Sequence, residues 1–407
     1  MNGYPRLDGL IVRAAYSRLL GWIFIPMMRL YLRISRSASR RYLYARVLVM
    51  LDLHYGRYDR ADALERLIQS TEELRRQSHY ELGGFRPAEL RYSSGCFRVL
   101  ADRRVVELSR YLLTGVDEAE ERLQELLPER VPVTTFFMMS GCGPSPFNPM
   151  LGDVYLKVGH YSQKPHDREI VLHALAHEAT HMYLRQVLGF SVFEAEYGPR
   201  KLLDEGFAQL CGFRAAGALK RKLAHADTCA AAAMDHEGDV LPVRIREWRC
   251  TPEERGHYPL YQVALSFVAS LEREYGFATL LDVFRDADSH SSLNRQLERN
   301  LGQGLGELLG RWAADLVPGG RQEDFVTISL AARDSGNGLQ FDYRSQKPLY
   351  PRKDILAYSM DGGCQLAVSC KEDLRYRTEG SFRVAQAQPG AVELIIAFDD
   401  LMQRVTI

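Results

Sequence analysis

The sequence predicts an α+β protein with a mainly helical core, a small mixed sheet, N-terminal helices and a C-terminal all-β module. Three observations favour this fold class. Apolar residues recur with a helical period through most of the chain up to residue 316. Short runs rich in β-branched and aromatic residues interrupt that period between residues 96 and 158. From Phe325 onwards the apolar period changes to two, as in half-buried strands.

Three domains are expected, because 407 residues are too many for a single hydrophobic core. Residues 1–84 form an N-terminal basic helical segment that ends at a pair of glycines. Residues 85–320 form the central domain, which closes with a Pro-Gly-Gly turn. Residues 321–407 are expected to form a small module resembling a β-sandwich.

The composition excludes a disordered chain, since 46% hydrophobic and 26% charged residues are ordinary for a globular protein. Seven cysteines without a Cys-x-x-Cys pair do not form a disulfide framework. They are interpreted as buried thiols in a reducing compartment, which favours a cytoplasmic location. A single bridge between Cys364 and Cys370 stays open as an alternative.

The N-terminal segment is strongly basic. Residues 1–46 contain nine arginines, no lysine and one acid, for a net charge of +8. The densest apolar run, residues 19–28, is about half of the ~20 residues that span a bilayer, and no signal cleavage site follows it. Peripheral membrane contact, an organelle-targeting role and a core helix with a solvated arginine face all stay open. Nucleic acid is not expected as a partner, because no base-stacking module accompanies the arginines. The arginines of the expected helical face are Arg29, Arg33, Arg36 and Arg40.

The helical pattern of the central domain predicts two helices that carry polar motifs. The first is expected to begin with Asp167 as its N-cap and to end at Gly189. The second is expected to begin after Pro199 and to run towards Gly212. Single helices are also expected over residues 103–127, 258–275 and 293–316, and strands over residues 96–100, 131–138 and 152–158.

The first motif helix carries His177-Glu178-Ala-Thr-His181. Histidines at i and i+4 lie on one helical face and can bind the same zinc ion, while the intervening glutamate can act as a general base. A hydrolytic zinc site needs a third protein ligand and an open position for water. Glu205, 24 residues after His181 on the next predicted helix, supplies that ligand. The prediction is therefore one Zn²⁺ per chain, bound by His177, His181 and Glu205.

The two motifs, HEATH and LLDEGFA, resemble the gluzincin zinc peptidases, the clan of thermolysin and aminopeptidase N, and in particular their peptidase-MA-like branch. The similarity covers roughly residues 92 to 316. It implies a gluzincin core in which His177, His181 and Glu205 are the ligands and Glu178 is the base. The residues reached from the metal chemistry are the same four.

The resemblance also implies an oxyanion donor. The stretch that begins at Tyr261 is similar to the aminopeptidase helix that starts with a tyrosine, and this tyrosine stabilises the tetrahedral intermediate. Tyr258 is the reserve candidate, and a purely structural role for both tyrosines is the alternative. Two departures point away from an aminopeptidase. The GxMEN motif is absent, and the spacing from His181 to Glu205 is longer, with residues 190–197 filling the extra length.

Three neighbours of the motifs have alternative interpretations. His173 is two helical turns from His181, so a supporting or packing role is expected rather than metal binding. Asp204 either orients a ligand histidine or is exposed to solvent. Residues Val154–Val158 form either the edge strand on which a peptide substrate lies or an ordinary strand.

The function predicted from these residues is a zinc-dependent metallopeptidase, with endopeptidase action the more natural expectation. Its partner is a peptide or protein substrate. Two alternatives remain: a non-catalytic, metal-stabilised scaffold or regulatory binding protein, and a hydrolase of a non-peptide amide or ester. Retention of Glu178 and of a candidate tyrosine argues against the scaffold, because a structural zinc site needs neither. The sequence does not determine the oligomeric state.

Overall fold

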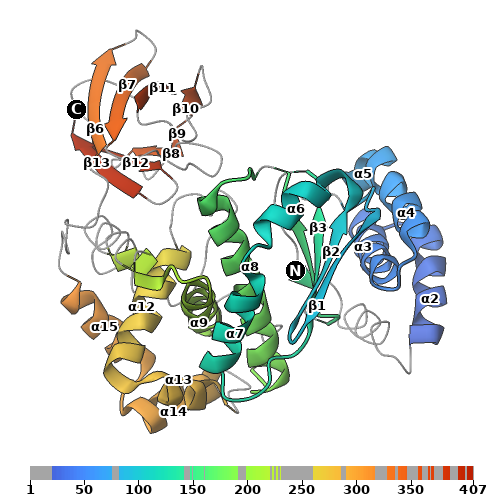
Figure 1. The fold of residues 1–407 in the computed structure, drawn as a ribbon, viewed down its shortest axis with the longest axis horizontal. Coiled ribbons are helices and arrows are strands. Elements are labelled where there is room, and N and C mark those ends of the chain that lie inside the picture. The colour runs from blue at the N-terminus through green and yellow to red at the C-terminus, as the bar shows by residue number, and fades with distance from the viewer. Residues whose placement is uncertain are drawn as a thin grey trace. The chain divides into compact units, whose positions relative to one another are not determined.

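The computed structural model is mainly helical, with a small mixed sheet and separate antiparallel sheets, which confirms the α+β prediction (Figure 1). The chain divides into two compact units, residues 1–187 with 214–217, and residues 188–213 with 218–407. The division into three domains stays a prediction. The structure describes residues 21–75, 82–141, 147–148, 150–159, 161–190, 199–220, 222–223, 226–227, 230, 260–285, 290–316, 328–334, 338–345, 356–359, 365–366, 368–370, 379–385, 393–398 and 401–406.

The first unit is built on a five-stranded mixed sheet in the order β1-β2-β3-β5-β4. The three central strands β2, β3 and β5 are parallel, whereas β1 and β4 pair antiparallel with β2 and β5. The three strands expected from the sequence are therefore confirmed, and two are added at the edges. The strands are β1 (Pro87–Ser94), β2 (Phe97–Asp102), β3 (Thr134–Met139), β4 (Phe147–Asn148) and β5 (Asp153–Lys157).

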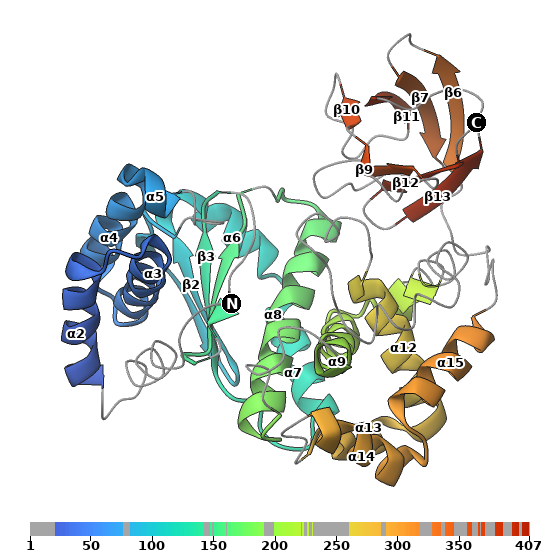
Figure 2. The same ribbon diagram turned by 180° about the vertical axis from the view of Figure 1, so that it is seen from behind.

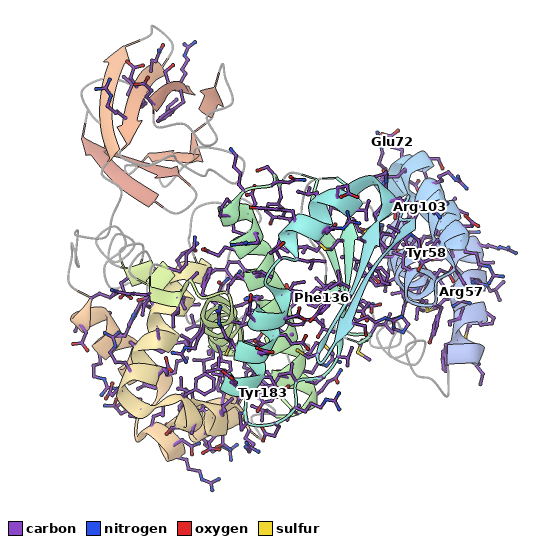
Figure 3. The ribbon with its side chains drawn as sticks, viewed as in Figure 1. Arg57, Tyr58, Glu72, Arg103, Phe136 and Tyr183 are labelled. Atoms are coloured by element: carbon purple, nitrogen blue, oxygen red, sulfur yellow. The ribbon has the colours of Figure 1, made fainter. Side chains whose placement is uncertain are left out.

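Helices cover both faces of this sheet, with α2 to α5 on one side and α6, α7 and α8 on the other (Figures 1 and 2). Successive residues of β3 divide between the two sides, as the pleat of a strand requires. Phe136 lies on the side of α8 (Figure 3), where its ring packs edge-on against Phe97 at 5.8 Å. Phe137 points the other way and stacks on Tyr155 at 5.1 Å between ring centroids.

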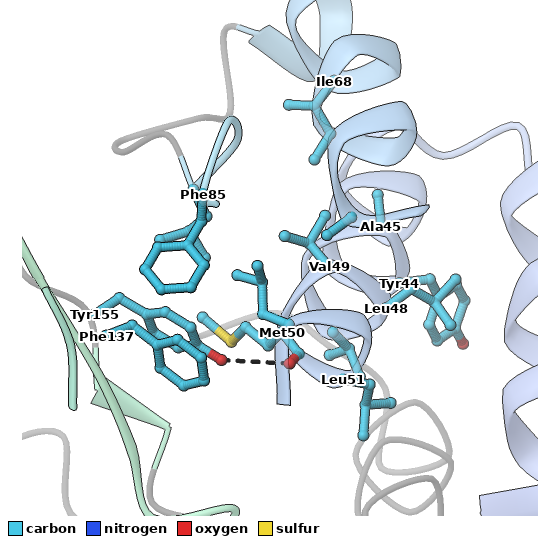
Figure 4. Packing of buried hydrophobic residues seen from close by; sticks show 14 of the residues in the cluster. Tyr44, Ala45, Leu48, Val49, Met50, Leu51, Ile68, Phe85, Phe137 and Tyr155 are labelled. Atoms are coloured by element: carbon cyan, nitrogen blue, oxygen red, sulfur yellow. Dashed lines mark hydrogen bonds between the residues drawn. The ribbon is translucent and has the colours of Figure 1, made fainter. Parts of the chain in front are cut away.

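The N-terminal helices share a hydrophobic core with the sheet (Figure 4). Phe137 and Tyr155 face Met50 of α3, and the Tyr155 hydroxyl donates to the Met50 carbonyl at 3.3 Å. Ten consecutive residues of α3, Tyr44–Leu53, are buried because the helix has neighbours on both sides. These helices are α2 (Gly21–Ile34), α3 (Ala38–His54), α4 (Tyr58–Ser70) and α5 (Glu72–Arg75).

Two expected continuous helices are interrupted in this unit. Residues 35–37 separate α2 from α3, and Ser37 caps α3 by accepting from the backbone N–H of Arg40 at 3.4 Å. The expected single arginine face over residues 29–40 is therefore wrong, because Arg36 lies in the break. The expected helix over residues 103–127 is a 3₁₀ turn (Arg103–Val105), α6 (Val106–Leu112) and α7 (Val116–Leu126), and Gly115, with φ of 86°, separates α6 from α7.

The second unit contains helices around a cluster of aromatic rings. Phe207 packs against Phe277 at 5.2 Å and against Phe284 at 4.9 Å, and Phe267 packs against Trp312 at 5.7 Å. The expected helix over 293–316 is two helices, because Gly302 adopts a φ of 74°. The helices of this unit in the described residues include α9 (Pro199–Ala215), α12 (Leu260–Tyr275), α13 (Phe277–Phe284), α14 (His290–Leu301) and α15 (Leu305–Asp315).

The C-terminal residues form two four-stranded antiparallel sheets, in the orders β10-β11-β7-β6 and β13-β12-β8-β9. The described residues of this region all lie in strands, as the all-β prediction requires, and the sandwich packing stays a prediction. The strands are β6 (Ile328–Asp334), β7 (Gly338–Ser345), β8 (Leu356–Ser359), β9 (Gln365–Leu366), β10 (Val368–Cys370), β11 (Glu379–Ala385), β12 (Glu393–Phe398) and β13 (Leu401–Thr406).

Candidate metal centre

The helix that carries the histidines is α8 (Pro165–Gln186) of the first unit. It starts three residues earlier than expected, because Lys164 rather than Asp167 is the N-cap and Pro165 occupies the first turn. Asp167 instead accepts hydrogen bonds from the backbone N–H of Ser162 at 2.8 Å and from its hydroxyl at 2.6 Å. The helix also ends earlier than the predicted Gly189. Its interior is largely buried, so the side chains of the motif are held in a fixed frame.

His177 and His181 meet on one face of α8. Their Nε2 atoms are 3.0 Å apart, their rings are nearly perpendicular, and each side chain is 7% exposed. Two imidazole nitrogens bound tetrahedrally to zinc at ~2.0–2.1 Å are ~3.3 Å apart. The observed separation is close to this value. A hydrogen bond between the two rings accounts for it as well, with one nitrogen protonated and the other accepting.

Glu205 completes a buried group of three candidate ligands. Each of His177, His181 and Glu205 offers one ligand atom, and these atoms all lie within 4.8 Å of one another. In the described part of the chain, these three residues are a group whose ligand atoms lie close enough together to bind one metal ion. Two imidazoles and one carboxylate match the donor set of catalytic zinc sites. The group can therefore hold a metal ion, whereas imidazole ligands also suit other transition metals, so the donor set does not fix the element.

Lys201 is an unexpected neighbour of this group. Its ammonium donates to Oε1 of Glu205, one helical turn further along α9. Burial opposes the charge of Lys201, but the carboxylates of Glu205 and Asp204, with Tyr261, outweigh it and raise the lysine pKa above its ordinary value. Lys201 is therefore a cation that balances the Glu205 carboxylate. Sequence reasoning missed it, although the i, i+4 spacing of a lysine and a glutamate was a usable signal.

Asp204 is buried, with 1% of its surface exposed, which excludes the alternative that it is exposed to solvent. Its neighbour Gly206 lies against α12. A Cβ atom at Gly206 would be 2.4 Å from the carbonyl oxygen of Ala264 and 2.5 Å from a methyl group of Val268. The glycine after Glu205 therefore permits a close approach of α9 and α12, which fixes the helix turn that carries the candidate ligand.

Glu178 and Tyr261 were predicted to act in catalysis, and they differ in exposure. Glu178 is half-buried and follows His177 directly on α8. Tyr261 is the second residue of α12 and is 46% exposed. It is one of the groups that raise the pKa of Lys201. Tyr258, the reserve candidate, and residues 191–198 of the lengthened connection lie outside the described residues. Phe190, which begins that connection, is buried beneath the guanidinium of Arg200 at 4.5 Å.

His173 is buried on α8, and its ring centroid is 5.5 Å from that of His177. It is not a member of the three-residue ligand group. The strand β5 is not the edge of the sheet, because β4 pairs with it at Asp153 and Val154. Of the two alternatives for this strand, the edge strand is therefore excluded at this end of β5, whose five residues are all buried.

Neither the comparison with models of known protein families nor the comparison with curated proteins finds a match for this chain. Within the described residues, no helix has both the length and the apolar character needed to cross a membrane. The chemistry of the candidate metal centre therefore rests on its own residues.

Proposed function

We propose that this protein is a zinc-dependent metallopeptidase of the gluzincin type that cleaves internal peptide bonds. The observation that carries the proposal is the buried group of His177, His181 and Glu205, with Glu178 adjacent to the first histidine on α8. A structural metal site needs no carboxylate in this position. The combination of three candidate ligands and a half-buried base is what hydrolysis of an amide requires.

The ligands in this proposal are the Nε2 atoms of the two histidines, which face each other, and a carboxylate oxygen of Glu205. When bound, the zinc ion polarises the substrate carbonyl and lowers the pKa of a water molecule towards ~7. A carboxylate has two oxygens, so Glu205 can keep its contact with Lys201 through one of them. Lys201 then restrains the orientation of Glu205, as outer partners of metal ligands do.

Glu178 acts as the general base in this mechanism. It accepts a proton from the attacking water and later returns that proton to the leaving amine nitrogen. Its half-buried position on a largely buried helix suits both roles, because the helix holds the carboxylate beside His177 without burying the residue completely. Tyr261 is partly exposed at the start of α12. Its hydroxyl donates a hydrogen bond to the substrate carbonyl oxygen, which becomes negative in the transition state.

The proposal is tested by incubating the zinc-loaded protein with peptides whose two termini are blocked, and by reading the products with mass spectrometry. Internal cleavage is expected from the wild type. Glu178→Gln is expected to keep its zinc and to lose about 10²- to 10⁴-fold in rate. Glu169→Gln is the matched control, since Glu169 is a half-buried glutamate on the same helix.

Zinc content separates the steps of the test. His181→Ala and Glu205→Gln are expected to lose stoichiometric zinc, as measured by mass spectrometry of the metal. Equal cleavage by wild type and Glu178→Gln would exclude the assigned mechanism. Zinc binding without cleavage of any peptide would favour a metal-stabilised scaffold or a hydrolase of non-peptide amides or esters.

A further inference from the structure

The helix α2 (Gly21–Ile34) is apolar on two opposite faces. Met28 and Leu32 lie on its inner face and are 0% and 8% exposed. Ile23, Leu30 and Ile34 follow one another at i, i+7 and i+11, a spacing that keeps them within ~40° of one another around the helix axis. They are 45%, 56% and 61% exposed. The outer face of α2 is therefore a row of exposed aliphatic side chains, about 16 Å long at 1.5 Å per residue.

The orientation of α2 is fixed by contacts on its other side. Tyr31 stacks on Tyr44 of α3 with ring centroids 5.8 Å apart, and Arg29 forms an ion pair with buried Asp52 at 3.7 Å. These contacts set the direction in which the exposed row points.

Single exposed apolar residues are normal on protein surfaces. A continuous row of them on one helix instead marks a site of interaction with a partner or a membrane. In the described part of the chain, seven large apolar side chains are exposed, and three of them form this row. The row therefore marks a surface that fits an apolar partner.

Positive charge flanks the C-terminal end of the row. Arg33 belongs to α2, Arg36 lies in the turn after it and Arg40 in the first turn of α3, and all three are exposed. Three other arginines of this region form ion pairs instead, Arg29 with Asp52, Arg41 with Glu73 and Arg46 with Glu65. A partner for this surface must therefore accept aliphatic side chains and must carry negative charge beside them. The guanidinium group suits phosphate in particular, because its fork can bind two oxygens.

We propose that α2 binds the surface of an anionic lipid bilayer, as a peripheral contact of the folded protein. Ile23, Leu30 and Ile34 enter the boundary between headgroups and acyl chains, and Arg33 and Arg36 contact lipid phosphates. This combination of one apolar face and basic side chains is that of helices which lie in the plane of the interface.

A lipid surface fits these observations better than two other partners. A second copy bound through the same face would bring the two arginine groups together, because a two-fold interface is self-complementary. Like charges in such an interface oppose binding. Nucleic acid would satisfy the arginines but would leave the aliphatic row without an apolar partner.

The proposal is tested by sedimentation of the full chain with two kinds of vesicles, phosphatidylcholine alone and phosphatidylcholine mixed with phosphatidylglycerol. Binding is expected to the mixed vesicles and to weaken as salt is added. The variant Leu30→Glu with Ile34→Glu is expected to bind at least about tenfold more weakly, since one buried aliphatic side chain contributes about that factor. Leu67→Glu is the matched control, as Leu67 is a leucine that is 38% exposed on α4, and it should bind like the wild type.

Arg33→Gln with Arg36→Gln tests the charge separately. These residues are exposed, so the variant is expected to melt at the wild-type temperature and to lose its preference for phosphatidylglycerol. The proposal is overturned if the wild type does not bind the mixed vesicles, or if Leu30→Glu with Ile34→Glu binds them as the wild type does. Sedimentation velocity provides a further test. If the wild type is a dimer and only Leu30→Glu with Ile34→Glu dissociates it, the row joins two copies and the membrane proposal is overturned.

Discussion

The ammonium group of Lys201 donates a hydrogen bond to the carboxylate of Glu205, which lies one turn later on the same helix. Glu205 is 3% exposed, and Lys201 supplies the positive charge that faces its carboxylate. A metal ion held by His177, His181 and Glu205 would act on the same carboxylate as this ammonium group. The balance of charge at the candidate metal centre depends on a residue that is not itself a ligand.

Replacing Lys201 with methionine is expected to destabilise the metal-free protein by about 1–3 kcal/mol, because a buried carboxylate loses its cation. Added zinc should then raise the melting temperature of the variant more than that of the wild type. The measurement is thermal unfolding with and without zinc. Lys201→Arg, which keeps the charge, serves as the control, and an equal zinc effect in all three proteins would contradict the idea that Lys201 balances Glu205.

Gly206 provides a test of how closely α9 and α12 are packed. Gly206→Ala is expected to cost about 2–3 kcal/mol and to weaken metal binding, since its methyl group would overlap the backbone of Ala264 and displace the turn of Glu205. Gly310→Ala on α15 is the control. A Cβ atom there meets no heavy atom within 4 Å, so the helix should gain up to about 1 kcal/mol. The measurement is the free energy of unfolding in urea. Equal values for Gly206→Ala and Gly310→Ala would show that α9 and α12 can move apart without loss of stability.

The grouping of the three candidate ligands could be predicted from sequence, because two of them have a local spacing. His177 and His181 are one turn apart on a helix, and any helical conformation of that stretch brings their rings together. To predict Glu205 as the third candidate ligand, it was enough to expect a second helix with an acidic residue on its buried face. The gluzincin resemblance, the zinc ion and the catalytic roles of Glu178 and Tyr261 are not decided by this geometry and stay predictions.

Other features depend on contacts between distant segments and could not be read from local patterns. Asp204 is buried by tertiary packing, although an aspartate next to a glutamate suggests an exposed site. The core shared by α3 and the sheet joins Met50 to Tyr155, residues far apart in the chain. Breaks such as Gly115 and Gly302 interrupt helical periods that continue across them, because a positive φ is not visible in apolar spacing.

The pH dependence of stability is expected to reflect Asp102 at the end of β2. Burial acts to raise its pKa, but hydrogen bonds from the Arg104 side chain and from the backbone N–H groups of Arg104 and Arg86 outweigh it, and the pKa is lowered from 3.8. A lowered folded-state pKa means that the folded protein favours the carboxylate. This contribution is fully present above the unfolded value of 3.8 and is lost as the pH falls through the folded one.

Asp102→Asn is therefore expected to destabilise the protein by about 2–3 kcal/mol at pH 7. The difference from the wild type should narrow as the pH falls below about 4. Urea unfolding across this pH range is the measurement. Asp59→Asn is the control, because that side chain is 96% exposed and its pair with Arg86 contributes little. A difference for Asp102→Asn that stays constant into acid would refute the role of its charge.

Tyr261 provides the sharpest test of the catalytic arrangement, and the prediction depends on the proposed peptidase activity. If its hydroxyl donates to the developing oxyanion, Tyr261→Phe should lower kcat about 10²-fold. KM and zinc content should change little, because the phenol is not a metal ligand and its donation strengthens only in the transition state. Tyr261 is 46% exposed, so the loss of its hydroxyl is not expected to unfold the protein.

Tyr275→Phe, at the other end of α12, is the matched control for Tyr261→Phe. The Tyr275 hydroxyl accepts from Arg311 at 2.5 Å and lies 3.4 Å from Gln303, so its removal affects packing between helices rather than chemistry. Stability should fall slightly in this variant while kcat is retained. Steady-state kinetics on one blocked peptide compares the two. An unchanged kcat in Tyr261→Phe would assign Tyr261 a structural role at the start of α12 and would move the search for the oxyanion donor to Tyr258.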